Sequence, residues 1–501
     1  MKRTIHSMPT RKDVIEQDPG VVESFYAIIC FSRSLNIVRG NRIKPMFSAE
    51  SDGVDLAKCR RDFADAIAYF CAYKSDPDCV TAVALGQRET KVILWVASNA
   101  KVPRKVVDFL ESNVLNVVQR LAYTFMQEQL PPSEAERITG LLNEVLQFTS
   151  EKNFKYYKRA VTTWKGIYRS GITEENPNLD LAIFHQWFKR TFQTDGDWLA
   201  KCDMPKLSSL CYDQRKNKTF DILKHFSSQG NEHSLEYERL HKLLYKLGKH
   251  IMLFKKMIHA TFSLRQVFQR GFIVEPIPAS TPKPIPLPKL TDRALKNIVT
   301  RIFPGDDERN QFYHHLDQFY DLNMEKIKQS LQPWEKTQVR VHAEILLIDY
   351  LDKSSAEFLD INDKYVGCSK PACYLCYQYI CQHPGKYTHP PTHQKVYHAW
   401  ALPIVQANDR NCSDKYARHN RFLRQIAEDL RSELRHEVRR QLAPRKFHAD
   451  STAGESSVVD ISRARLRSKG LDDSILALIR KISEEESSGC DADLDDGGVM
   501  L

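Results

Sequence analysis

The spacing of apolar side chains along the chain predicts two helices separated by a pair of strands. Residues 55–73 carry apolar side chains at helical spacing, and helical spacing returns after Asn99. Between these stretches lie two β-like runs, at residues 79–85 and 91–97, joined by a short polar link. We therefore predict a β-hairpin between the two helices.

The sequence also predicts a long helical region, from its apolar spacing, and then an extended region, from its prolines. From about residue 101 to 270, almost the whole sequence has the pattern of amphipathic helix. Prolines then occupy nearly alternate positions between 276 and 288, which favours polyproline II geometry and a semi-rigid linker. A ligand for an SH3- or WW-type domain of a protein partner is the less favoured interpretation of this run.

Charge is distributed unevenly along the chain. The formal net charge is +10, and because residues 484–501 hold seven acidic and no basic residues, the rest of the chain carries +17. A basic body favours a polyanionic partner such as nucleic acid. An ordinary solvated surface explains the same charge equally well.

Cysteine placement and hydropathy narrow the class of protein. The twelve cysteines are scattered and cluster only around residues 368–381, which favours reduced thiols and metal binding over a disulfide framework. The N-terminus shows no secretory signal, and no apolar run is long enough to cross a bilayer. We expect an intracellular protein, cytoplasmic or nuclear, with no membrane partner.

Two short motifs carry the candidate chemistry. His342-Ala343-Glu344 is followed about thirty residues later by Cys373-Tyr374-Leu375-Cys376. His342, Cys373 and Cys376 are zinc ligands by type, and zinc held by three protein ligands keeps a fourth position for water. Each motif follows a short extended run and opens a predicted helix, where the helix dipole favours a carboxylate or a thiolate. Zinc-dependent nucleobase deaminases pair an H-x-E motif with C-x-x-C in this way.

These residues resemble the nucleic acid/nucleotide deaminase superfamily, and residues 365–376 are most similar to a fungal expansion of deaminase-like proteins. The resemblance spans about sixty residues, from Val339 to Trp400. It implies a three-layer αβα fold with a mixed sheet, here elaborated by a large all-α region. It also implies Zn²⁺ on His342, Cys373 and Cys376, with Glu344 moving a proton from the zinc-bound water to the base. The implied substrate is a nucleobase in a nucleic acid or nucleotide.

One departure from the superfamily motif and one additional cysteine leave an alternative function open. Ala372 separates Pro371 from Cys373, where the superfamily usually has Pro directly before Cys. Cys368 is a possible fourth metal ligand, which would close the site into a structural Cys₃His centre. The alternative function is therefore a catalytically inactive deaminase-fold scaffold or binding protein with structural zinc.

The resemblance also suggests where the sheet and the substrate contacts come from. We expect the hairpin at 79–99 to supply the first two strands, with the following helices inserted before the motif helix. In many superfamily members a polar residue that closes the second strand touches the substrate, which makes Asn99 a candidate substrate-binding residue. Residues 395–402 are the expected next strand, and Trp400 in it is a second candidate, with core packing as the alternative role.

The predicted organisation has six segments, and the linker and the tail are the candidate sites for protein partners. In chain order these are a disordered N-terminus (1–20), N-terminal helices and the β-hairpin (21–100), a helical insertion (101–275), a Pro-rich linker (276–290), a zinc deaminase-like core (291–447) and a mostly disordered acidic tail (448–501).

Overall fold

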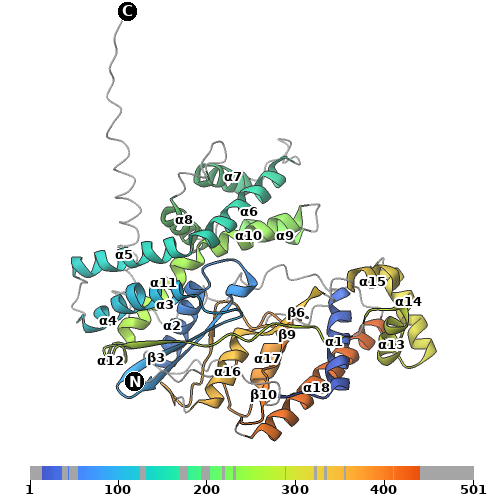
Figure 1. Ribbon diagram of the computed structural model, residues 1–501. Coiled ribbons are helices and arrows are strands. Elements are labelled where there is room, and N and C mark those ends of the chain that lie inside the picture. Colours follow the sequence, from blue (N-terminus) through green and yellow to red (C-terminus); the bar gives the residue numbers. More distant parts are fainter. Residues whose placement is uncertain are drawn as a thin grey trace, which may run out of the picture.

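The protein has a mixed α/β fold in which many helices surround small mixed sheets (Figure 1). The computed structural model describes residues 14–35, 43, 55–124, 131–169, 179–192, 203–216, 220–229, 233–287, 289–320, 324–331, 336–354, 357–409 and 411–440. The predicted acidic tail and most of the predicted disordered N-terminus lie outside these ranges. Among the described residues, no helix combines the length and the apolar character needed to cross a membrane.

The predicted hairpin is present and forms the centre of the largest sheet. Strands β2 (Thr81–Arg88) and β3 (Lys91–Ser98) pair antiparallel along their whole length, from Thr81 opposite Ser98 to Arg88 opposite Lys91. Glu89 takes a positive φ of 55° in the tight turn between them. A short 3₁₀ turn (Pro77–Cys79) leads into β2 and lies beside the end of β3, because Asn99 N–H donates to Val80 and Ala100 N–H donates to Asp78.

Segments far away in the sequence extend this sheet on both sides. Strand β4 (Phe272–Pro276) pairs parallel with β3, so the chain returns to the sheet after the helical region. Strands β7 (Glu357–Phe358) and β8 (Gly367–Cys368) both pair antiparallel with β2. Gly367 is required here because a Cβ would lie 2.6 Å from the backbone of Ala64 in the helix above.

Both faces of the hairpin are covered by helices, and alternate side chains point to each face. One set packs into a core with α1 (Pro19–Ser34), α16 (Ala343–Lys353), α17 (Tyr374–Cys381) and α18 (Cys412–Arg439): Ala82, Ala84, Ile93, Trp95 and Ala97. The other set packs with α2 (Leu56–Cys71), α4 (Leu115–Tyr123) and α11 (Lys249–Ser263): Val83, Leu85, Val92, Leu94 and Val96. The two motif helices and the α2–α11 layer therefore lie on opposite faces of the hairpin.

The predicted helical stretch is confirmed over the described part of residues 101–270. Helix α3 (Arg104–Asp108), a π-helical segment (Phe109–Val114), α5 (Pro132–Phe148) and α12 (Arg265–Phe268) continue the α2–α11 layer. Helices α6–α10 stand above that layer in Figure 1 around a separate aromatic core. Their bounds are Ser150–Arg169, Leu179–Phe192, Met204–Lys216, Asp221–Ser228 and Ser234–Leu247.

Two smaller sheets and three helices complete the described fold. Strand β6 (Gln338–Val341) pairs with β5 (Lys283–Pro284) and with β9 (Trp400–Ala401). Strand β1 (Val14–Ile15) pairs with β10 (Val405–Gln406), so this part of the predicted disordered N-terminus is structured. Helices at the right of Figure 1 pack near α1 and α18: α13 (Asp292–Ile302), α14 (Asp306–Tyr320) and α15 (Met324–Leu331).

Two extended segments differ from what their composition predicts. Of the strand predicted at 395–402, only Trp400–Ala401 pairs, because the backbone of Lys395 instead bonds to Tyr374 N–H, at 2.9 Å. The described part of the Pro-rich run lies along the edges of two sheets. Ile277 N–H donates to Val96 at 2.8 Å, and Lys283–Pro284 pairs with β6.

Candidate metal centre

The first motif begins where β6 ends. His342 is the N-cap of α16, with extended backbone angles, and Glu344 lies in the first turn of that helix. The side-chain oxygen of Asn99 accepts the Ala343 N–H at 2.8 Å, and the Asn99 amide nitrogen donates to the Pro77 carbonyl at 2.9 Å. Asn99, at the end of the hairpin, therefore satisfies one of the first N–H groups of α16 and fixes where this helix starts.

The second motif begins after β8. Cys373 is the N-cap of α17, and its Sγ accepts the Cys376 N–H at 3.4 Å. The extra residue Ala372 is held in a β-bridge with Thr392, where its N–H donates to Pro391 and its carbonyl accepts the Thr392 hydroxyl, both at 2.8 Å. The Pro-x-Cys spacing is thus accommodated by pairing with the 391–393 loop, and α17 itself starts only at Tyr374.

The three predicted ligands converge. The Nδ1 atom of His342 lies 3.6 Å from Cys373 Sγ and 3.4 Å from Cys376 Sγ, and the three ligand atoms all lie within 4.8 Å of one another. With Zn–S about 2.3 Å and Zn–N about 2.0 Å, a tetrahedral zinc requires N···S separations of roughly 3.5 Å. The observed spacing fits this requirement, and the group could hold a metal through Nδ1 and the two thiolates.

Glu344 lies beside this group without being one of its three ligands. Glu344 is 4% exposed, and its Oε2 lies 3.9 Å from Cys376 Sγ. Burial raises the pKa of Glu344, while the neighbouring His342 lowers it to a smaller extent. A buried carboxyl group with a raised pKa is suited to take up a proton and release it again.

The ligands influence the charge of one another. Burial acts to raise the pKa of the Cys373 thiol, but hydrogen bonding from Cys376 and the charge of His342 hold it well below its usual range. Burial acts to lower the pKa of His342, and the adjacent Cys373 and Glu344 raise it above its usual value. Both shifts favour a thiolate on Cys373 beside a protonated His342, and a metal bound through Nδ1 would displace the imidazolium proton.

Cys368 lies close to this group but outside it. It sits in β8, where its N–H donates to Asp65 at 3.0 Å and its thiol contacts the Val366 carbonyl at 3.6 Å. Burial, with added contributions from Glu344 and Asp65, raises the pKa of Cys368 well above its usual value. Its role as a fourth ligand stays a prediction, since it is not a member of the three-atom cluster.

Trp400 packs behind the ligands. It is 1% exposed and contacts the rings of Phe25 and Phe422, with centroids 5.9 and 5.8 Å away. Its indole N–H has no hydrogen bond of standard geometry within the described chain. Burial and the neighbouring Cys373 raise the pKa of the Cys376 thiol well above its usual value, and Trp400 opposes this rise to a smaller extent. Its substrate-binding role is therefore still a prediction, while its packing role is visible directly.

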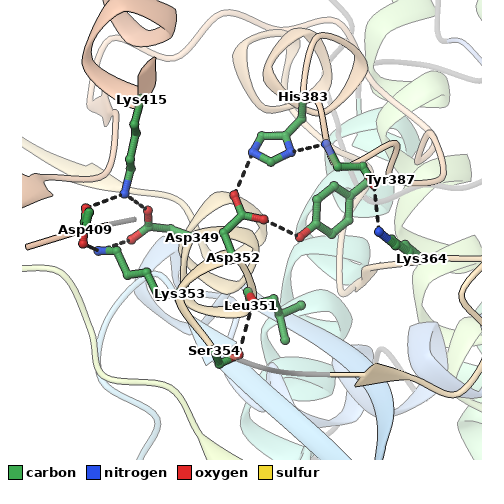
Figure 2. Close-up of polar contacts among 11 residues, drawn as sticks. Asp349, Leu351, Asp352, Lys353, Ser354, Lys364, His383, Tyr387, Asp409 and Lys415 are labelled. Atoms are coloured by element: carbon green, nitrogen blue, oxygen red, sulfur yellow. Dashed lines mark hydrogen bonds and ion pairs between the residues drawn. The ribbon is translucent and has the colours of Figure 1, made fainter. Parts of the chain in front are cut away.

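A ring of charges that sequence reasoning missed fixes the far end of α16. Lys415 bridges Asp349 at 2.5 Å and Asp409 at 3.0 Å, and Lys353 bridges the same two carboxylates at 3.0 and 3.4 Å (Figure 2). The ring joins the helix of the first motif to the start of α18. Only the Asp349–Lys353 spacing of four residues gave a local signal for it.

A second polar group closes the loop after α17. His383 Nε2 lies 3.0 Å from Asp352, which also accepts the Tyr387 hydroxyl at 3.1 Å, and His383 Nδ1 accepts the Gly385 N–H (Figure 2). A cleft of about 860 Å³ opens between this loop and α18, and Arg418 and Arg421 also line it. None of the three metal-ligand candidates lines this cleft.

The segment that contains both motifs is similar to a known protein family. Residues 341–404 match the model of a family described as "OTT_1508_deam:-like deaminase", a segment that contains both motifs. The resemblance to the deaminase superfamily is thereby confirmed for this part of the chain. No curated protein and no solved structure matched the chain.

Proposed function

We propose that this protein is a zinc-dependent hydrolytic deaminase that acts on a nucleobase in a nucleic acid or nucleotide. One observation carries the proposal: His342, Cys373 and Cys376 meet at zinc-ligand spacing beside the buried Glu344. All four lie in the segment that matches a deaminase family. A structural zinc site has no need of a buried, proton-accepting carboxyl group next to its ligands.

Each residue of the site has a distinct task in this proposal. His342 Nδ1 and the two thiolates hold the metal, which when bound supplies an acidified water as the nucleophile. Glu344 takes one proton from the attacking water at its carboxylate and delivers it to the base, and it then carries a second proton, from the newly added hydroxyl group, to the leaving amine. Asn99 fixes the start of α16. The indole of Trp400 opposes the burial and the Cys373 contacts that raise the pKa of the Cys376 thiol.

We also propose that the core is the three-layer αβα arrangement of this superfamily. Its support is the burial of both faces of the β2–β3 hairpin, with α16 and α17 on one face and α2 and α11 on the other. The junction of β8 with β2 brings the second motif to the same sheet. The helices between β3 and β4 are then an insertion into the deaminase core.

The decisive experiment separates catalysis from metal binding. In zinc-loaded protein, Glu344→Gln is expected to lower ammonia release from the best substrate of a panel of nucleosides, nucleotides and single-stranded oligonucleotides by roughly 10²- to 10⁴-fold. Zinc stoichiometry and thermal stability stay at the level of the unsubstituted protein. Glu357→Gln, on the exposed strand β7, is the matched control and retains activity.

The competing hypothesis, an inactive scaffold with structural zinc, predicts different results. Under it, no substrate of the panel releases ammonia, and Glu344→Gln changes nothing measurable. Cys368→Ser provides a second distinction. Zinc content that survives this substitution supports the three-ligand site, whereas loss of zinc shows a closed four-ligand centre.

A further inference from the structure

The cleft between α18 and the loop after α17 is separate from the metal centre. Its volume of about 860 Å³ suits a small organic molecule better than a single ion. Members of the charge ring and the His383–Asp352 pair line its walls (Figure 2). Asp352 and Lys353 are the last two residues of α16, whereas His342 caps the other end of that helix. A ligand in this cleft would therefore leave the metal centre free.

His419 of α18 lines the cleft and has no hydrogen-bond partner in the described part of the chain. It is 0% exposed, and both of its ring nitrogens are buried without a hydrogen bond to a described residue. Its ring lies 6.1 Å from that of Tyr379, between centroids. A neutral imidazole has one donor and one acceptor, and such groups are rarely left unsatisfied in a folded protein. His419 therefore points to a polar ligand in the cleft.

The charges that act on His419 are basic. Burial, and then neighbouring basic groups led by Lys415 and Arg418, lower the pKa of His419 to about 3. His383 and Lys353 act in the same direction. His419 is therefore neutral at physiological pH and lies in a positive potential, which favours an anion in the cleft over a cation.

Two arginines of α18 give the cleft its anion-binding character. Arg418 and Arg421 both line it, and their spacing of three residues places them on one side of the helix. The Nε atom of Arg418 is buried without a hydrogen bond to a described residue. Arg421 is exposed and forms no ion pair within the described ranges. Planar guanidinium groups are well suited to bind the oxygens of a phosphate group.

The acidic side chains along the cleft are engaged or lie at its rim. The charge ring contains two aspartates and two lysines and is neutral as a whole. Asp352 accepts the Tyr387 hydroxyl and lies 3.0 Å from His383. Burial acts to raise the pKa of Asp352, but these two partners, followed by Arg418, hold it below its usual value. Asp414 is exposed in the first turn of α18. The two arginines are thus the cations left for a ligand.

An apolar wall and a helix N-terminus adjoin the two arginines. Tyr379 and Phe422, each 4% exposed, contact each other edge to face at 5.8 Å and line the cleft together with Pro384. This wall can pack against the organic part of a ligand. Asn411, the N-cap of α18, also lines the cleft, and its side chain makes no capping hydrogen bond. The positive end of this 28-residue helix therefore adds to the attraction for an anion.

We propose that this cleft is a binding site for a small organic phosphate. Arg418 and Arg421 hold the phosphate group at the start of α18, and the organic part packs against the aromatic wall. His419 donates its ring N–H to an oxygen of the ligand. A phosphate group offers up to two negative charges and several acceptor oxygens to these donors. Binding is independent of the deaminase reaction, because none of the three metal-ligand candidates lines the cleft.

The first experiment measures binding of phenyl phosphate to the zinc-loaded protein by calorimetry, at constant ionic strength. Phenyl phosphate combines a phosphate group with an aromatic ring and has no nucleobase. It is expected to raise the melting temperature and to bind at least about tenfold tighter than three comparison compounds. Of these, inorganic phosphate lacks the ring, phenol lacks the anionic group, and benzoate carries a single charge.

The second experiment locates the binding by substitution. Arg421→Gln, at an exposed position, is expected to weaken phenyl phosphate binding about tenfold. Arg440→Gln, exposed at the other end of α18, is the matched control and binds as the unsubstituted protein does. His419→Phe removes both ring nitrogens and keeps an aromatic ring. Its binding is expected to weaken about tenfold while the melting temperature without ligand does not fall, because no hydrogen bond within the described chain is lost.

The proposal is overturned if phenyl phosphate does not bind, or if any of the three comparison compounds binds as tightly. It is also overturned if Arg421→Gln and His419→Phe bind phenyl phosphate as tightly as Arg440→Gln does. These outcomes are distinct from failure of the proposed function. A protein that binds phenyl phosphate in the cleft but releases no ammonia contradicts the deaminase reaction alone. An active protein that does not bind phenyl phosphate contradicts the cleft site alone.

Discussion

At the scale of single residues, Asn99 shows how much of the site depends on a side chain outside both motifs. Its side-chain oxygen accepts the Ala343 N–H, and its side-chain nitrogen donates to the Pro77 carbonyl. The first of these bonds lies one residue after His342, the N-cap of α16. Asn99 therefore joins the end of the hairpin to the start of the metal-binding helix, a positioning role that does not depend on its contact with a substrate.

Substitution of Asn99 tests that positioning role. Asn99→Ala is expected to lower the free energy of unfolding by about 1 kcal/mol, the usual cost of a lost helix N-terminal hydrogen bond. It is also expected to weaken zinc binding, because His342 is then less firmly oriented. Denaturant unfolding and competition with a zinc-binding dye measure the two effects.

Asn113→Ala provides the matched control for Asn99→Ala. Asn113 donates to Glu144 in an exposed position on the opposite side of the hairpin. Its loss should leave zinc affinity unchanged. Equal zinc affinity in Asn99→Ala and Asn113→Ala would show that Asn99 does not position the ligand.

At the scale of elements, α16 is held at both ends by groups from distant sequence. Asn99 caps its start, and the charge ring with Asp409 and Lys415 holds its end against α18 (Figure 2). Lys415 is 10% exposed at its side chain and Asp409 is 6% exposed. In such surroundings the ring acts as one unit, and removal of one member leaves a buried charge uncompensated.

Lys415→Met is expected to destabilise the protein by roughly 3 kcal/mol, because Asp349 and Asp409 then face each other with only Lys353 between them. Arg424→Met is the comparison on the same helix, where the partner Asp18 is exposed and the loss is expected to stay below about 1 kcal/mol. Urea unfolding of both variants checks the difference. Equal midpoints would show that the ring contributes no more than a surface ion pair.

At the scale of the whole molecule, the metal site joins elements that large apolar cores already hold together. The three described cores contain many fully buried side chains, and the ligands Cys373 and Cys376 are buried members of one of them. Ten cysteines within the described ranges are free thiols, so no disulfide there supplements these cores. The fold is therefore expected to persist without metal, in contrast to small zinc domains.

Removal of zinc with a chelator is accordingly expected to lower the melting temperature while far-UV circular dichroism keeps its helical shape. Free zinc at about 100 times its dissociation constant should restore about 2.7 kcal/mol of stability. Cys373→Ser abolishes this response, and Cys381→Ser, outside the ligand group, retains it. Loss of the helical signal on chelation would instead indicate that the metal is essential to the fold.

Local sequence was sufficient to predict the two motifs and the helices that begin at them. His342, Glu344, Cys373 and Cys376 could be predicted because ligand types at fixed spacing open two helices, and α16 and α17 begin within one residue of those motifs. The hairpin could be predicted for a similar reason, from alternation and a polar turn. The full strand at 395–402 could not, because only its last part pairs with β6, while the Lys395 carbonyl accepts the Tyr374 N–H of the second motif.

The sequence by itself determined the kinds of chemistry present: two motifs with three soft ligands and one carboxyl group, a hairpin, and a long series of amphipathic helices. Only the tertiary structure decided which of these meet. Asn99 is an ordinary polar position in the sequence, and it fixes the start of α16 only because the end of the hairpin packs against that helix. Ligand type and helical periodicity are local properties, whereas burial and charge proximity depend on contacts between residues hundreds of positions apart.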